Sequence, residues 1–260
     1  TIHTVHGYGF HAHQKKISFL ITYLLEFFTT FATSHFVCVS SHDVKIGKKS
    51  LPGFKIKNSI IRAAVDFEKF TNYEQKHIEP LNNDKPFIFG TVSCFKPQKN
   101  LFDLLLAFKE VFSKNPNVKL ELVGDGIMRT EIEKWIKEQR MQSCIILHGW
   151  QDNVAPIMSN WNTFVLSSLW EGLPCAVVEA RLLRLPVIAY DTGGISDIIK
   201  HGQNGFLVKQ GNTQALSKYM QKISTESDLY KSMRSYNDNL ESFKNENMVD
   251  SHIQLYKHLF

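Results

Sequence analysis

Residues 167–194 read SSLWEGLPCAVVEARLLRLPVIAYDTGG, and this stretch decides the fold. An apolar, strand-like run at 163–167 leads into it. A helical pattern follows over 174–185, and Pro174 stands where proline is favoured, in the first turn of a helix. A second strand-like run at 186–190 comes next. Strand, helix and strand in this order predict a β-α-β unit of a parallel sheet.

The same alternation extends on both sides of this stretch. Near-continuous apolar strands separated by helices favour a doubly wound parallel sheet with helices on both faces. We therefore predict one complete Rossmann-like domain over 87–223. Its expected strands are 87–92, 118–123, 144–148, 163–167, 186–190 and 206–208. Its expected helices are 100–113, 127–140, 153–160, 174–185, 194–200 and 212–223.

Residues 1–70 contain too few elements for a second domain of this kind. We expect strands at 1–5, 36–41 and 58–62, one apolar helical stretch at 15–36, and a basic loop with Gly47, Pro52 and Gly53 between 42 and 57. This part is expected to be the closing portion of a Rossmann-like domain, so that the sequence begins partway through it. The polar segment 71–86 is the predicted linker. Residues 224–260 are expected to form helices that pack back toward the amino-terminal part.

The net charge of +5 is concentrated at one end of the 260-residue chain. Residues 1–57 hold seven lysines against Glu26 and Asp43, whereas residues 58–260 are neutral. This distribution argues against a nucleic-acid partner, which would select a basic footprint more widely. It suggests a local anionic partner such as a lipid surface.

The apolar stretch 15–36 leaves two interpretations open. Lys15, Lys16 and Glu26 bracket an uncharged run that is too short to cross a bilayer, which takes about 20 residues. The stretch is therefore either an amphipathic helix packed within a domain or one that lies on a membrane.

The four cysteines, Cys38, Cys94, Cys144 and Cys175, are widely spaced and lie in apolar runs. No Cys-x-x-Cys pair and no Cys/His ligand spacing occurs. We interpret them as reduced core residues of a cytosolic protein rather than a disulfide or zinc framework.

Ligands of open parallel sheets bind outside the carboxyl ends of the strands, so the loops there are candidate sites. Lys99 precedes a helix, and a lysine beside free N–H groups at a helix start suits a phosphate. Glycines 124 and 126 would allow close approach to a ligand, although a plain turn explains them equally well. The loop 191–194 offers a second anion-binding turn. No Asp-x-Asp pair suggests a metal-bound nucleotide.

Two glutamates stand eight residues apart in the deciding stretch. Glu171 lies in the loop, and Glu179 lies about one and a half turns into the helix among apolar neighbours. A carboxylate in such surroundings needs partners, because an unpaired buried charge is costly. Either Arg181 or Arg184 pairs with Glu179, or a vicinal diol donates two hydroxyl groups to it. The two glutamates alone leave both interpretations open.

These residues together resemble a known family. The segment 171–174 with Glu179, followed by 185–189 and 193–194, is similar to the E-x7-E signature of the retaining glycosyltransferases of family 4, which have the GT-B fold. Other segments that resemble motifs of this family are 4–7, 39–40, 65–66, 97–100, 124–126 and 202–208. Each motif is short, but the joint match is specific and extends across most of the chain.

The resemblance implies a role for each matching residue. Glu179 would bind the ribose hydroxyls of a nucleotide-diphospho-sugar, and Lys99 its diphosphate. Glu171 would hold the donor sugar together with the backbone of Gly172, Leu173 and Pro174. Gly124 would lie near the base and ribose. His6 would approach from the other domain toward the sugar or the acceptor, unless it merely caps a turn. Glu171 and His6 are thus the expected catalytic residues.

The implied reaction is transfer of a sugar, most simply from a UDP-sugar, to a saccharide or a lipid-linked saccharide in cell-surface polysaccharide synthesis. No cofactor and no metal would be required, and no nucleic acid would be bound. The implied location is cytoplasmic, with peripheral contact to the inner face of the plasma membrane. Two alternatives remain: an inactive nucleotide-sugar-binding fragment, and a sugar-nucleotide epimerase of the same architecture.

Three departures from the family pattern bear on this interpretation. Cys94 occupies the position of the arginine that usually accompanies the lysine on the diphosphate, so Lys99, the helix ends, and Arg62 or Lys96 would have to supply the positive charge. Ala63 and Ala64 replace the usual Asn-Gly. The opening part of the family's amino-terminal domain, with its glycine-rich loop, has no counterpart.

Overall fold

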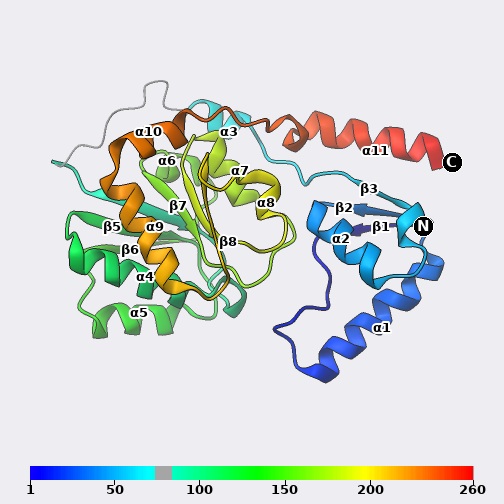
Figure 1. Ribbon diagram of the computed structural model, residues 1–260, viewed down its shortest axis with the longest axis horizontal. Helices are drawn as coiled ribbons and strands as arrows, with labels where there is room; N and C mark the ends of the chain where they lie inside the picture. The colour runs from blue at the N-terminus through cyan, green and yellow to red at the C-terminus, as the bar shows by residue number, and fades with distance from the viewer. Residues whose placement is uncertain (74–83, 260) are drawn as a thin grey trace.

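The computed structural model describes residues 1–73 and 84–259, so most of the predicted linker 71–86 lies outside the described residues. Two parallel sheets lie beside one another (Figure 1). We call residues 1–62, which carry the three-stranded sheet, the small lobe, and residues 84–243, which carry the six-stranded sheet, the large lobe. The α/β class with parallel sheets that the sequence predicts is confirmed.

The sheet of the large lobe has the strand order β6-β5-β4-β7-β8-β9, and every neighbouring pair is parallel. After β4 the chain first builds outward through β5 and β6 and then returns to place β7 on the other side of β4. Ligands of doubly wound sheets bind at such a reversal, outside the carboxyl ends of the two strands. The strands are β4 (Phe87–Val92), β5 (Val118–Val123), β6 (Ile145–Gly149), β7 (Thr163–Leu166), β8 (Val187–Tyr190) and β9 (Gly205–Val208).

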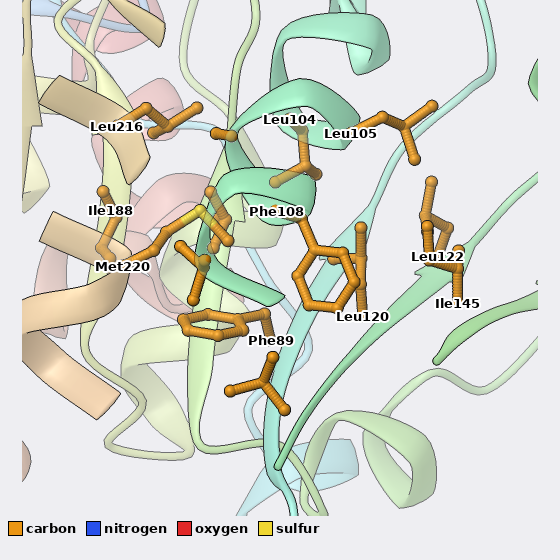
Figure 2. Close-up of a cluster of buried hydrophobic side chains, with 14 of the residues drawn as sticks. Phe89, Leu104, Leu105, Phe108, Leu120, Leu122, Ile145, Ile188, Leu216 and Met220 are labelled. Carbon is orange, nitrogen blue, oxygen red and sulfur yellow. The ribbon is translucent and has the colours of Figure 1, made fainter. Parts of the chain in front are cut away.

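Helices cover both faces of this sheet, and one apolar core lies on each face. Figure 2 shows the first core, where Phe108 of α4 and Met220 of α9 lie against Phe89 and Leu120 of the sheet. The second core lies between the sheet and α6, α7 and α8. The helices are α4 (Leu101–Lys114), α5 (Arg129–Glu138), α6 (Ala155–Met158), α7 (Cys175–Leu182), α8 (Ile195–Ile198), α9 (Thr213–Thr225) and α10 (Ser227–Ser235).

The cores of the large lobe extend past residue 223, where the sequence placed the end of the domain. Tyr230 and Met233 of α10 are buried in the first core, and Phe243 is buried in the second. Val65 also belongs to the second core, and its N–H donates to the carbonyl of Phe243. A short helix, α3 (Glu68–Thr71), follows Val65. The carboxyl-terminal segment is therefore part of the large lobe as far as residue 243.

The small lobe consists of β1 (Ile2–Val5), β2 (His35–Cys38) and β3 (Asn58–Ile60) with helices α1 (Lys16–Ala32) and α2 (Ser41–Ser50). The predicted basic loop over 42–57 is wrong in its first part, because α2 occupies it. Ser40 caps this helix by accepting a hydrogen bond from the N–H of Asp43. The sequence pattern favoured a loop here because Gly47 is a poor helix former. A Cβ there would lie 2.4 Å from Tyr8 Oη and 2.5 Å from the ring of Phe54.

Helix α1 packs one side on the small lobe and leaves much of its apolar surface exposed. Thr30 is buried, and Tyr23 packs against the core that contains Phe10 and Phe36. Among the described residues, no helix is long and apolar enough to cross a membrane. The exposed apolar side chains of α1 are Ile17, Phe19, Leu20, Ile21, Leu24, Leu25, Phe28 and Phe31.

The last helix, α11 (Asn245–Leu259), leaves the large lobe and runs alongside the small lobe (Figure 1). Residues of α11 and of the β3 edge line a groove of about 630 Å³. None of the described α11 side chains is buried. The helix therefore spans from one lobe to the other without forming a core of its own.

Candidate functional site

A cavity of about 200 Å³ lies between the lobes. The carboxyl ends of β1, β2, β7 and β8 all lead into residues of its wall. The small lobe contributes His6, Gly7, Tyr8, Phe10, His11, His42, Asp43 and Ile46. The large lobe contributes Gln98, Trp170, Glu171, Gly172, Thr192 and Gly193. The cavity thus forms where the topology of the large lobe predicts a ligand site.

Lys99 and Glu171 form an ion pair across the two loops that follow β4 and β7. The distance from Lys99 Nζ to Glu171 Oε1 is 2.5 Å, and both side chains are largely buried. Gln98 connects the same two loops by two hydrogen bonds. Its side-chain Nε2 donates to the backbone carbonyl of Trp170, and its backbone carbonyl accepts from the N–H of Leu169. The predicted phosphate lysine and the predicted catalytic glutamate are therefore direct neighbours.

Gly172 brings the large lobe into backbone contact with the small lobe. A Cβ on Gly172 would lie 2.4 Å from the carbonyl oxygen of His6, so a larger residue does not fit. Gly193, at φ +56°, approaches Glu171 in the same way, and Gly194 N–H donates to the Gly172 carbonyl. These contacts place His6 beside the Glu171 loop.

Glu179 lies half-buried on α7, which begins after the buried Pro174. Burial raises the pKa of the Glu179 carboxyl, and the charge of Lys69 partly offsets this. Arg181 is not its partner: the Arg181 guanidinium is buried and binds Asp238, with 2.6 Å from Nη2 to Oδ2. The Arg181 interpretation of Glu179 is therefore wrong.

Cys175 connects the two glutamates electrostatically. Burial raises the pKa of its thiol, and the negative charges of Glu179 and Glu171 raise it further, while Lys99 lowers it. Groups that act on one thiol in this way lie in the same neighbourhood. The charges of Glu171, Glu179 and Lys99 thus all act at Cys175, the first residue of α7.

Gly124 follows β5 at φ +128°. A Cβ there would lie 1.9 Å from the carbonyl oxygen of Ser93, and its N–H donates to the Gly149 carbonyl. Gly124 thus serves the close packing of neighbouring loops at the carboxyl edge of the sheet. Of the predicted site residues, Glu171, Gly172 and His6 line the cavity, whereas Lys99, Gly124, Leu173, Pro174 and Glu179 lie outside its lining.

Arg62 does not supply the missing positive charge near Lys99. Its guanidinium binds Asp197 of α8 and the Val39 carbonyl, and Ser41 N–H donates to the same Asp197 carboxylate at 2.8 Å. Burial would raise the pKa of Asp197, but the hydrogen bonds from Ser41 and the Arg62 charge outweigh it, so the pKa is lowered. Arg62 thus joins the two lobes.

Lys96 and Cys94 are exposed residues of the loop that holds Lys99. The prediction that all four cysteines are core residues is therefore wrong for Cys94. Cys38 and Cys144 are buried, Cys175 is half-buried, and all four are free thiols. Lys96 is thus an exposed lysine in the same loop as Lys99.

Sequence interpretation missed several residues of the cavity wall, among them His11, Trp170 and Asp43. The His11 ring stacks on Trp170 across the lobes, with ring centroids 4.1 Å apart at 19°. Burial lowers the pKa of His11, and the nearby His13 adds to this. Asp43, the third of these, is 1% exposed. The sequence holds a signal for Asp43, since a serine followed by an acid three residues later is typical of a helix start.

A metal site was not expected from the sequence. Among residues 1–73 and 84–259, no group of three or more His, Cys, Asp or Glu side chains is arranged to hold a metal ion.

A family profile described as "Glycosyl transferases group 1" matches residues 72–240, well over half of the chain. The chain belongs to the group 1 glycosyltransferases. This membership confirms the family resemblance that the E-x7-E stretch indicated. The profile covers the large lobe with both glutamates, Lys99 and Gly124.

Curated relatives extend the similarity into the small lobe. The chain is 30% identical over 217 residues to an Escherichia coli UDP-Gal:alpha-D-GlcNAc-diphosphoundecaprenol alpha-1,3-galactosyltransferase, covering 80% of this chain and 56% of that protein. It is 26% identical over 243 residues to the Staphylococcus aureus capsular polysaccharide biosynthesis glycosyltransferase CapM, covering 88% and 62%. The chain therefore spans only a little over half the length of these relatives.

Solved glycosyltransferase structures share the fold. A Staphylococcus aureus TarM variant in complex with Fondaparinux, alpha-GlcNAc-glycerol and UDP superposes with a TM-score of 0.83 at 19% identity, covering 98% of this chain and 50% of that one. HepE from Anabaena, in complex with UDP and glucose, gives a TM-score of 0.79 at 19% identity, covering 99% and 70%. At this identity the likeness shows the fold, and it confirms the GT-B arrangement of the two lobes.

Proposed function

We propose that this chain forms the donor-binding part of a retaining glycosyltransferase that takes a sugar from a UDP-sugar. The observation that carries the proposal is the Lys99–Glu171 ion pair at the carboxyl ends of β4 and β7. A phosphate group that binds Lys99 replaces one anion by another, and it frees Glu171 to accept hydrogen bonds from sugar hydroxyls. One ligand that carries both groups, a nucleotide-diphospho-sugar, satisfies both residues.

Glu179 is proposed to bind the ribose. Its carboxylate lies half-buried, and Arg181, the nearest candidate counter-ion in sequence, is committed to Asp238. Two hydroxyl groups of a vicinal diol would satisfy the two carboxylate oxygens. The names of the E. coli relative and of the HepE complex, which mention UDP-Gal and UDP, support uridine as the base.

The proposed chemistry stabilises a departing diphosphate and a developing positive charge on the sugar. Lys99 and the N–H groups that begin the helices after β4 and β8 would stabilise the leaving group. The leaving phosphate could then take the proton of the acceptor hydroxyl on the same face of the sugar, which retains its configuration. Glu171 acts as a positioning group in this scheme, because a single glutamate is not the carboxylate pair of retaining hydrolases. His6 stands beside it at the contact between the lobes.

The proposed acceptor is a saccharide, and more specifically a lipid-linked saccharide of a cell-surface polysaccharide. The E. coli relative's name includes diphosphoundecaprenol, and CapM is named for capsular polysaccharide biosynthesis. In this chain the small lobe carries the lysine excess and the exposed apolar side chains of α1. Both features suit contact with an anionic membrane at its cytoplasmic face. No metal takes part in this scheme.

A second candidate function is nucleotide-sugar binding without transfer. It is favoured by Cys94, which leaves Lys99 without the second cation of the family pattern. An epimerase of the same architecture is less well supported, because the Glu171–Glu179 spacing and the glycine turn at 202–205 fit the transferases better.

Melting temperatures measured with a panel of nucleotide-sugars test the donor assignment, because a bound ligand stabilises the native state. A rise with UDP-sugars that Glu179→Ala abolishes and Cys94→Ala preserves is the expected result. An unchanged melting temperature with every nucleotide-sugar would refute the proposal. Incubation with the stabilising UDP-sugar and a saccharide, followed by product detection, then separates a transferase from a binding protein.

A further inference from the structure

Asp43 is a buried carboxylate in the cavity wall for which the donor chemistry above has no use. It lies in the first turn of α2, is 1% exposed and lines the cavity. Ser40 Oγ donates to its Oδ2 at 2.7 Å. Among the described residues, Ser40 is the hydrogen-bond partner of this side chain, so Oδ1 is left for another donor.

Helix capping explains why a serine stands at position 40, but it does not explain why the Asp43 carboxylate is buried. The cap requires the hydroxyl of Ser40, which accepts from Asp43 N–H at 3.0 Å. A carboxylate in the first turn is favourable beside the helix dipole, but an exposed position serves that purpose equally well. Burying it costs free energy unless partners compensate. The position of Asp43 in the wall of a cavity therefore calls for a ligand.

The groups around Asp43 favour its ionised form only in part. Burial raises the pKa of the Asp43 carboxyl and the charge of Asp197 adds to this, whereas Ser40, His42 and His6 lower it. A hydroxyl group that donates to the carboxylate would compensate for the burial further.

We infer that Asp43 is an acceptor-positioning residue, whose carboxylate accepts a hydrogen bond from a hydroxyl group of a neutral saccharide held on the small-lobe side of the cavity. This inference rests on the proposed function. The large lobe contributes Glu171 and Gly172 to the same cavity, so a saccharide beside Asp43 would lie close to the proposed site of the donor sugar. Tyr8 and Phe10, both in the same wall, provide apolar surface for a sugar ring.

The carboxylates of Asp43 and Glu171 determine whether the bound saccharide can carry a negative charge. Asp43 lines the same small cavity as Glu171, and once a donor phosphate has taken Lys99 the two carboxylates together would repel a second phosphate or carboxylate group placed between them. The sugar ring that enters the cavity is therefore uncharged. Any phosphate of a lipid-linked acceptor would stay outside the cavity.

The test uses the 260-residue chain saturated with UDP and three neutral probes, the octyl glycosides of glucose, galactose and N-acetylglucosamine. Their binding is measured by calorimetry and saturation-transfer NMR. We expect at least one probe to bind, and Asp43→Asn to weaken it by about tenfold or more, because a hydrogen bond to a charged group is lost. UDP affinity should stay unchanged, and the melting temperature should not fall, because Asp43→Asn removes a carboxylate whose pKa burial raises.

Ser40→Ala is the control for the helix cap, because it removes the hydroxyl that caps α2 and donates to Asp43 but keeps the Asp43 carboxylate. It should lower the melting temperature and preserve saccharide binding. Unchanged saccharide affinity in Asp43→Asn overturns the inference, as does a loss of melting temperature or UDP affinity parallel to the loss of saccharide. Failure of all three probes to bind the wild-type chain overturns it too, while leaving the donor site standing. Failure of UDP itself to bind removes the proposed function and this inference together.

Discussion

Lys99 and Glu171 neutralise each other across two loops that are 72 residues apart in the chain, with 2.5 Å between Nζ and Oε1. Their side chains are 17% and 8% exposed. The resting pair therefore presents little net charge to solvent. An anion that binds Lys99 competes with Glu171 for the same ammonium group, and we propose that its binding releases Glu171.

This exchange predicts opposite behaviour of two variants. Lys99→Met should weaken UDP binding by about tenfold or more, since a charged hydrogen bond to phosphate is lost. Glu171→Gln should keep or strengthen UDP binding, because it removes the competing anion, and should abolish sugar transfer. Calorimetry with UDP and with UDP-sugars measures both effects. Equal weakening of UDP binding by the two variants would contradict the exchange.

Glu179 should make donor binding depend on pH. Its pKa is raised by burial, so the free carboxyl gains a proton above the usual pH range of a glutamate. A diol needs the carboxylate as acceptor, and UDP affinity should fall as the pH is lowered through this raised pKa. Glu179→Gln should bind UDP weakly at every pH. Calorimetry between pH 5 and 8 gives the profile, and a flat wild-type profile with full affinity would refute the assignment.

The same pKa shift has a consequence for stability. A buried carboxylate with a raised pKa lowers the free energy of unfolding as the pH rises from the ordinary pKa of glutamate through the raised value, because the folded state comes to hold an unfavourable charge. Without ligand, Glu179→Gln should therefore melt at a higher temperature than the wild-type chain at pH 8. The difference should shrink toward acid pH. An unchanged difference across this range would speak against the shift.

Cys94 offers a gain-of-affinity test. Cys94→Arg restores the second cation of the family pattern, and we expect UDP binding to tighten by about tenfold through a charge-assisted hydrogen bond. Cys94→Ala is the control and should leave the affinity unchanged. Because Cys94 is exposed, neither variant should change the free energy of unfolding by more than about 0.5 kcal/mol. Weaker UDP binding in Cys94→Arg would show that the loop does not face the diphosphate.

Gly172→Ala should separate the lobes. The new Cβ would meet the His6 carbonyl at 2.4 Å, and a backbone neighbour cannot move aside by changing a rotamer. We expect a loss of about 1–3 kcal/mol in stability and slower transfer. Gly9→Ala is the control, because its nearest atom would lie 3.9 Å away. Thermal melting and small-angle scattering measure the two effects, and equal behaviour of the two variants would refute the contact.

The lysines of α2 should matter for membrane contact. Changing Lys45, Lys48 and Lys49 together to Glu should weaken binding to anionic liposomes at least a hundredfold, at about 1 kcal/mol per lysine. The control changes three exposed lysines of the large lobe, Lys134, Lys137 and Lys218, with the same change in net charge. Cosedimentation with vesicles measures both. Equal losses would mean that only net charge acts, and no loss in the α2 variant would refute membrane contact through these lysines.

The large lobe could be predicted from the sequence almost strand by strand, because its buried strands are continuous apolar runs between amphipathic helices. The strands at 87–92 and 118–123 were predicted to the residue. Helix α2 was missed because Gly47, which normally signals a loop, is required there by its close contacts with Tyr8 and Phe54. At Gly47 the local sequence pattern predicts a loop, whereas tertiary packing requires a glycine within a helix.

The cavity was harder to predict than the donor loops. Lys99, Glu171 and Glu179 belong to motifs with fixed spacing, whereas His11 and Trp170 meet from positions 159 residues apart and carry no shared pattern. Asp43 is recognisable as a helix-start residue, but its place in the cavity wall depends on how the two lobes meet. No local sequence pattern indicates how the two lobes contact each other.

The Arg181–Asp238 pair has a consequence for what can fold on its own. Arg181 lies on the same helix as Glu179, with its side chain fully buried, and its counter-ion comes from the segment after α10. A proteolytic cut between α9 and α10, followed by loss of the tail, would leave that guanidinium charged in a dry site, at a cost of about 3–5 kcal/mol. The smallest autonomous folding unit must therefore run past residue 238, and the tail serves as a permanent counter-ion for the helix that carries Glu179.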